Sequence, residues 1–172
     1  MLLEETLLWL APERGGLFVD CTLGLGGHAH ALLARFPAAR LLGIDRDPRA
    51  LALARERLAG FGDRARCIEG NFRDLESLWG EHAAGEAPPA GIYADLGMSS
   101  LQLDDAGRGF SFQRDGPLDM RMGTSGPTAA ELVNFATEEN LEEIFREFGE
   151  EPEARRVARA VVAERRAGPI DT

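Results

Sequence analysis

Residues 20–28 read DCTLGLGGH, and this stretch decides the fold of the chain. A short apolar run, residues 17–19, precedes it, and apolar side chains at helical spacing follow it at positions 29, 32, 33 and 36. Glycines in such a turn let a backbone approach a ligand closely, and the start of a helix offers free N–H groups. The stretch therefore predicts a strand, a ligand-binding turn and a helix in succession.

The same alternation continues along the chain. Asp47 followed by Pro48 is typical of an N-cap and the first residue of a helix. Expected strands cover residues 17–19, 41–44, 66–68 and 92–94, and expected helices centre on Leu7, Leu33, Ala54 and Leu78. Strands alternating with amphipathic helices predict an α/β fold with a doubly wound parallel sheet.

The pattern stops between Gly97 and Pro127, where about thirty residues rich in Gly, Asp and Ser show no period. A loop of this length in a compact domain is usually functional. Beyond it the chain is helical, beginning with the capping box of Thr128 and Glu131. An apolar stripe follows at Leu141, Ile144, Phe145 and Phe148. We expect an α/β domain over 1–124 and a helical, substrate-recognising domain over 125–172.

Composition narrows the class of protein. The 172 residues are 44% hydrophobic and 28% charged, which is typical of a soluble globular protein. Neither a membrane span nor a secretory signal is visible, so we expect a cytoplasmic location without membrane partners. The formal charge of −10 argues mildly against nucleic acid as a partner. The cysteines are expected to be reduced, and the spacing of the histidines predicts no metal site.

Asp45 stands twenty-one residues after Gly24, where an acidic side chain accepts hydrogen bonds from ribose hydroxyls. Gly24, Gly26 and Ala29 also satisfy the loose dinucleotide pattern, so an NAD-dependent oxidoreductase is an alternative. Asp20, at the end of the first strand, would repel a pyrophosphate, whereas it suits the sulfonium and ammonium of S-adenosylmethionine. The residues therefore favour S-adenosylmethionine.

A third candidate site begins at Asp95, at the end of the fourth strand, which lies beside the first strand in doubly wound sheets. Exocyclic amino groups are poor nucleophiles, and an acceptor for their N–H favours a tetrahedral nitrogen aimed at the methyl group. The Asp95 carboxylate or the Leu96 carbonyl fits that role. Alternatively, Asp95 caps the following turn.

Two further segments have structural and functional interpretations. Phe110 and Phe112, within residues 108–116, could stack on bases, but phenylalanines that pack a loop onto a core are commoner. Arginines 155, 156, 159, 165 and 166 could contact RNA, but intervening glutamates favour a solvated helix face.

Four segments together resemble the bacterial ribosomal RNA small subunit methyltransferase H family, also called MraW. They are DLGMSSLQLD at 95–104, RGFSF at 108–112, DGPLDMRM at 115–122 and GIDRDP at 43–48, joined by the Gly26-Gly27-His28 turn. The resemblance covers essentially the whole chain, although Met98 stands where valine is usual.

The resemblance implies a class I methyltransferase sheet with an inserted helical domain, both incomplete here because family members run beyond Thr172. It implies methyl transfer from S-adenosylmethionine to N4 of a cytosine in small-subunit (16S) ribosomal RNA, free or in the assembling subunit, with no role for DNA. The implied cofactor contacts are Gly26, Gly27, His28, Asp45, Phe72, Asp95 and Gln102. Asp95, Leu96 and Gly97 would orient the target amine.

Besides the oxidoreductase, a non-catalytic binder of RNA or of the assembling ribosome is an alternative function for so short a chain. A homodimer is one expected assembly, because the fourth strand would be an exposed edge of the sheet.

Overall fold

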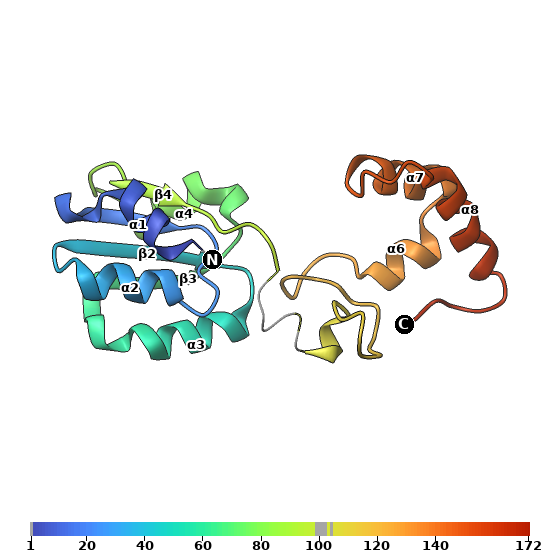
Figure 1. Cartoon of the computed structure of the whole chain (residues 1–172), viewed down its shortest axis with the longest axis horizontal. Coiled ribbons are helices and arrows are strands. Elements are labelled where there is room, and N and C mark those ends of the chain that lie inside the picture. The colour runs from blue at the N-terminus through green and yellow to red at the C-terminus, as the bar shows by residue number, and fades with distance from the viewer. Residues whose placement is uncertain (1, 99–102, 104) are drawn as a thin grey trace. The chain divides into compact units, whose positions relative to one another are not determined.

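A computed structural model describes residues 2–98, 103 and 105–172 of the chain (Figure 1). The structure divides into two compact units, the first ending at Gly97 and the second beginning at Met98. Gln102, which the family resemblance assigns to the cofactor, lies outside the described residues.

The first unit contains a four-stranded sheet in which every pairing is parallel. The strand order is β3-β2-β1-β4, which confirms the predicted doubly wound topology and the placement of the fourth strand beside the first. The strands are β1 (Gly16–Asp20), β2 (Ala39–Asp45), β3 (Ala65–Glu69) and β4 (Gly91–Tyr93). Ile92, at the centre of the edge strand β4, is 50% exposed.

Helices cover both faces of this sheet. Phe18 points into a core formed with α1 (Leu3–Leu10), α2 (Gly27–Arg35) and α3 (Pro48–Leu58). Val19, the next residue, points to the opposite face, which is covered by α4 (Leu75–His82). Successive side chains of a strand point to opposite faces, so the apolar run of β1 is buried on both sides. Short 3₁₀ helices follow α1, α3 and β3 at Pro12–Arg14, Ala59–Arg64 and Phe72–Asp74.

The predicted start of the helix after β2 is confirmed. The Asp47 side chain accepts a hydrogen bond from the Arg49 amide, and Pro48 occupies the first helical position. This cap fixes where the chain turns after β2, and so holds the loop that begins at Asp45.

The second unit contains α6 (Ala129–Phe135), α7 (Glu138–Glu147) and α8 (Ala154–Glu164), preceded by a 3₁₀ turn at Ala106–Arg108. The predicted capping box of Thr128 and Glu131 is present. Leu141 of α7 packs in the interior, as the stripe predicted. Phe148, the last residue of the predicted stripe, follows the last residue of α7 and is 82% exposed, so the apolar stripe is not buried to its end.

The long loop is bonded to these helices. The Leu118 amide donates to the Asp171 carbonyl at 2.8 Å, and the Ala130 amide donates to the Leu118 carbonyl at 2.7 Å. Arg108 donates to the carbonyls of residues 121 and 122. The loop thus belongs to the second compact unit, which begins earlier than the predicted boundary at 124/125; that assignment of functional domains stays a prediction.

The two phenylalanines of the long loop differ in their exposure to solvent. Phe110 is buried, so the packing interpretation is correct for it, whereas Phe112 is completely exposed. On α8, Arg159 pairs with Glu138, and Arg165 donates to the carbonyls of residues 133 and 136 at the end of α6. These two arginines therefore hold the helices together.

Across the described ranges, none of the helices combines the length and apolarity needed to cross a membrane.

Candidate functional site

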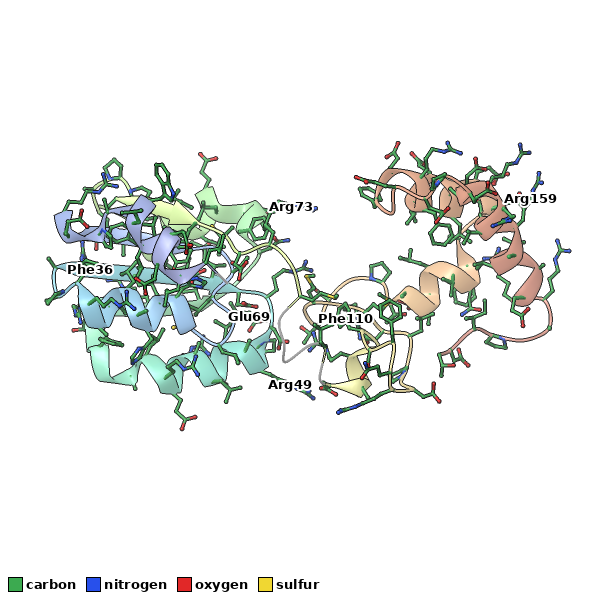
Figure 2. All side chains as sticks on the ribbon, in the orientation of Figure 1. Phe36, Arg49, Glu69, Arg73, Phe110 and Arg159 are labelled. Carbon is green, nitrogen blue, oxygen red and sulfur yellow. The ribbon has the colours of Figure 1, made fainter. Side chains whose placement is uncertain are left out.

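The carboxyl ends of all four strands meet at one edge of the sheet, because every pairing is parallel. Asp20, Asp45, Glu69 and Tyr93 are the last residues of β1, β2, β3 and β4. Figure 2 shows Glu69 at this end of the unit together with Arg49 and Arg73, whereas Phe36 marks the opposite end. Ligands of doubly wound sheets bind at this edge, beside the point where the strand order reverses. Here that point lies between β1 and β4.

The glycine turn presents its backbone at this edge. Gly26 is the N-cap of α2 and adopts a left-handed conformation with φ of +73°, and none of the described side chains caps the helix. A Cβ atom at this position would lie in van der Waals contact with Ala54 and Leu58 at 3.4 Å, so the left-handed φ is what favours glycine here. As at any helix start, the first amides of α2, including those of Gly27 and His28, lack an acceptor within the helix, and such amides can bind a ligand.

Asp45 connects the glycine turn to the loops that follow β2 and β3. One carboxylate oxygen accepts from the Gly24 amide at 2.7 Å, and the other accepts from the Asp47 amide at 2.9 Å. Its carbonyl accepts from the Gly70 amide at 2.9 Å, beyond the end of β3. Asp45 thus joins the loops after three strands, and its half-buried carboxylate keeps lone pairs for a ligand hydroxyl.

Asp20 lies beneath the glycine turn and is only 2% exposed. Burial raises the pKa of this carboxyl to about 6, against the opposing effect of the Thr22 amide, which donates to it at 3.0 Å. The Tyr93 hydroxyl also favours the ionised form and so holds the pKa down, and the charges of Asp45 and Asp95 raise it further. A buried carboxylate with acidic neighbours is a site that a cation would stabilise.

His28 and Tyr93 bring two buried polar atoms to the same place. Their rings meet edge to face with centroids 6.2 Å apart. Among the described residues, His28 Nε2 has no hydrogen-bond partner, and the contact of Tyr93 Oη with Asp20 falls short of a well-formed hydrogen bond. Buried polar atoms are normally paired, so these two indicate a place for a polar ligand group.

The other predicted site residues that the structure describes lie at the same edge. Phe72, just after β3, leaves 43% of its surface exposed, as a stacking surface requires. Asp95 and Leu96 follow β4 and are exposed. Gly97, with φ of +151°, is the last residue of the first unit.

Two contributions to this site were missed by the sequence reasoning. The Thr22 hydroxyl accepts a hydrogen bond from the Asp95 amide at 2.7 Å. Tyr93 stands in register with Asp20 across β1 and β4. The predicted neighbourhood of the first and fourth strands was the signal that could have located Tyr93, by counting from the two strand ends.

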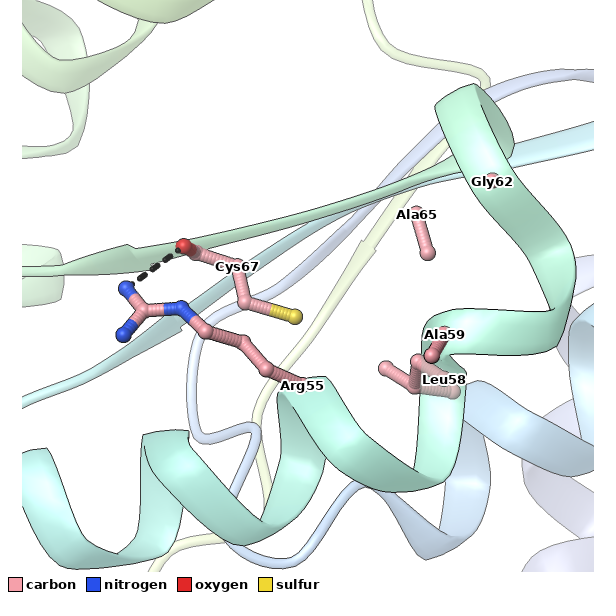
Figure 3. A pocket seen from close by; sticks show the side chains of 6 residues that line it. All are labelled: Arg55, Leu58, Ala59, Gly62, Ala65 and Cys67. Carbon is pink, nitrogen blue, oxygen red and sulfur yellow. Dashed lines mark hydrogen bonds between the residues drawn. The ribbon is translucent and has the colours of Figure 1, made fainter.

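A separate cavity of about 270 Å³ lies between α3 and the edge strand β3 (Figure 3). None of the predicted cofactor residues lines it; its wall consists of Arg55, Leu58, Ala59, Gly62, Ala65 and Cys67. Burial raises the pKa of the Cys67 thiol, which makes it a poor nucleophile at neutral pH. Within the ranges that the structure describes, no group of three His, Cys, Asp or Glu side chains could hold a metal ion.

Comparison with known proteins shows the family of the chain. The family model described as the MraW methylase family matches residues 1–172. The chain belongs to the MraW methylase family. The ribosomal RNA small subunit methyltransferase H of Methylorubrum populi is 49% identical over 172 residues, which are 100% of this chain and 48% of that protein. The protein of the same name from Beutenbergia cavernae is 51% identical over 165 residues, 94% of this chain and 49% of that protein.

This MraW-family chain therefore spans about half the length of the curated relatives it matches. Among solved structures, an rRNA methylase from Streptococcus thermophilus aligns with 43% of the chain and 45% of its own, at 22% identity and a TM-score of 0.37. The α/β class of the fold rests on the strand order and the family, not on this alignment.

Proposed function

We propose that this chain is the cofactor-binding part of a cytoplasmic enzyme that transfers a methyl group from S-adenosylmethionine to the exocyclic N4 of a cytosine in small-subunit ribosomal RNA. The observation that carries the proposal is the buried Asp20 carboxylate beneath the glycine turn. Membership of the MraW family and the names of the relatives support the RNA substrate.

The residues at the edge of the sheet fit S-adenosylmethionine. Its cationic methionine end would compensate Asp20 and give polar partners to His28 Nε2 and Tyr93 Oη. Its ribose hydroxyls would reach Asp45, and its adenine would lie against Phe72. When bound, the cofactor supplies an electrophilic methyl group.

The same residues argue against the NAD alternative. A pyrophosphate at the start of α2 would bring negative charge close to Asp20 and Asp45. In a site where Asp20 is 2% exposed, such repulsion is weakly screened. The glycine turn therefore favours a cationic ligand over a dinucleotide.

The segment after β4 supplies the groups that handle the target amine. The Asp95 carboxylate and the Leu96 carbonyl are acceptors at the exposed edge, beside β1. An acceptor that takes one N–H of the cytosine amine turns the nitrogen lone pair toward the methyl group. Asp95, Leu96 and Gly97 thus orient the nucleophile, and the proposal requires none of them to act as a general base.

RNA contacts fit the rim of the same edge despite the overall charge of −10. Arg46, Arg49 and Arg73 are exposed on the loops and first turns that follow β2 and β3. Local arginines can bind phosphates even on an acidic protein, and an unstacked single-stranded base can enter a pocket that a duplex cannot.

The test is methyl transfer to purified small ribosomal subunits and to naked small-subunit RNA. The 172-residue chain and a version extended to the length of its relatives are each incubated with labelled S-adenosylmethionine, and the RNA is digested to nucleosides. N4-methylcytidine formed by the extended protein, and abolished in its Asp45→Ala variant, is the expected result. Label in another nucleoside refutes the cytosine assignment, and RNA binding without cofactor binding favours the non-catalytic alternative.

A further inference from the structure

The hydrogen-bond ladder between β1 and β4 ends at the candidate site. Asp20 and Tyr93 are the last residues in register, and the Cys21 amide still donates to the Tyr93 carbonyl at 2.9 Å. The backbone then turns toward β2, where the Leu23 amide donates to the Ile44 carbonyl at 2.9 Å. From Thr22 onward, none of the main-chain hydrogen bonds among the described residues joins this segment to β4 or to the residues that follow it.

The Thr22 side chain joins the two segments instead. Its Oγ1 accepts from the Asp95 amide at 2.7 Å, which joins segments 73 residues apart. Its own amide donates to Asp20 Oδ1 at 3.0 Å. A hydroxyl therefore replaces the missing main-chain acceptor and continues the ladder beyond the end of both strands.

The segment held by this bond is the one that the proposed reaction needs. β4 ends at Tyr93, so residues 95–97 lie beyond the sheet, and Leu96 is 74% exposed. The glycine turn on the other side of Thr22 holds the cofactor under the proposed function. An error of about 1 Å between two reacting groups can lower a rate a hundredfold, so the distance between these segments matters.

We infer that Thr22 is a positioning residue, whose hydroxyl fixes the Asp95–Gly97 segment relative to the cofactor-binding turn. This inference rests on the proposed function. Thr22 acts through Asp95 and needs no contact of its own with the methyl group or the base.

A purely structural role for Thr22 predicts something different. Asp95 is exposed, so its amide can be hydrated when the hydroxyl is removed, and the loss to global stability is small. Because the family resemblance also counts Asp95 among the cofactor contacts, positioning instead predicts that the affinity for S-adenosylhomocysteine falls while the stability of the fold does not. The isosteric change Thr22→Val removes the acceptor, and Thr22→Ser keeps it.

The experiment compares the unchanged 172-residue chain with T22V, T22S and the control T6V, whose hydroxyl donates within α1 to the Leu2 carbonyl. Calorimetry with S-adenosylhomocysteine measures affinity, and urea unfolding measures stability. We expect T22V to bind about tenfold more weakly, T22S and T6V to bind within about twofold of the unchanged chain, and all four unfolding midpoints to agree. Equal binding by T22V, or no rescue by T22S, overturns the inference.

Hydrogen exchange of backbone amides is a second measurement of the same variants, and it needs no ligand. In T22V the Asp95 amide should exchange at least tenfold faster, while the Cys21 amide, which donates to β4, keeps its protection. If the unchanged chain binds no S-adenosylhomocysteine, the cofactor proposal fails, and exchange still decides whether Thr22 holds the segment. Unaltered exchange at Asp95 in T22V refutes that role.

Discussion

Replacing Asp20 by Asn should make the protein more stable and weaken its binding of a cationic cofactor. Asp20 is 2% exposed, and burial raises the pKa of its carboxyl from 3.8 to about 6. One pKa unit corresponds to about 1.4 kcal/mol, so ionised Asp20 costs the folded state roughly 3 kcal/mol at neutral pH. Asn keeps an oxygen that accepts from the Thr22 amide, so removing the charge should recover most of this free energy as stability.

The pH dependence of this cost has a definite sign. Below about pH 3.8 the carboxyl is protonated in both states, and the folded and unfolded chains differ little. Between that pH and about 6 the unfolded chain ionises first, so the free energy of unfolding of the wild type falls as pH rises. Above about 6 both states are ionised, and the full cost of Asp20 remains.

Urea unfolding of the wild type and of D20N, from about pH 4 to about pH 7.5, measures this difference. D20N should exceed the wild type by about 2–3 kcal/mol near neutrality, with the gap closing toward the acid end. The control Asp63→Asn, at an exposed residue, should show no such gap. A D20N protein that is less stable than the wild type at neutral pH, or a gap independent of pH, refutes the reasoning about burial.

Binding supplies the second half of this prediction. The preference of the wild type for S-adenosylmethionine over S-adenosylhomocysteine should decline as pH falls through about 6, because protonation removes the carboxylate that faces the cation. D20N should show the weaker preference at every pH. A wild-type preference for S-adenosylmethionine that does not change with pH would mean that Asp20 does not interact with the positive charge of the cofactor.

Two other predictions concern the second unit. A Cβ at Gly116 would lie 2.0 Å from the Ala106 carbonyl oxygen, so Gly116→Ala should lower the free energy of unfolding in urea by about 1–3 kcal/mol. The control Gly80→Ala, at a residue with open space around it, should not. Equal urea midpoints for Gly116→Ala and the wild type contradict this. Arg121 donates to the Asp119 carboxylate and lowers the pKa of Asp119 to about 2. The stability that Asp119 contributes is therefore full above about pH 3.8 and is lost as pH falls through about 2. The difference in unfolding free energy between the wild type and Asp119→Asn should therefore vanish near pH 2, and a gap that persists there is inconsistent with the ion pair.

Much of the local structure of both units could be predicted from short stretches of sequence. Asp47-Pro48 and the Thr128 capping box mark helix starts through bonds that span three residues or fewer, and the structure contains both. The strand order followed from the alternation of strands and helices, because crossovers between parallel strands have a fixed hand. The candidate site was predicted for the same reason, since parallel strands bring their carboxyl ends to one edge.

What the sequence did not indicate depends on contacts between distant residues. The hydrogen bond from the Asp95 amide to the Thr22 hydroxyl joins residues 73 positions apart, and neither residue type by itself predicts such a contact. The long loop joins the second unit through the Leu118 amide and the Asp171 carbonyl, a pairing without periodicity. The exposure of Phe148 could not be predicted, because an apolar stripe does not show where its helix ends.

The most direct test of the central claim, that the edge of this sheet binds S-adenosylmethionine, is calorimetric titration of the 172-residue chain with S-adenosylhomocysteine. The account predicts binding by the wild type and by the exposed-site control Asp63→Ala. It predicts at least a hundredfold loss in Asp45→Ala, which removes two backbone hydrogen bonds and the ribose acceptor. Binding of NAD by the folded chain without binding of S-adenosylhomocysteine would contradict it.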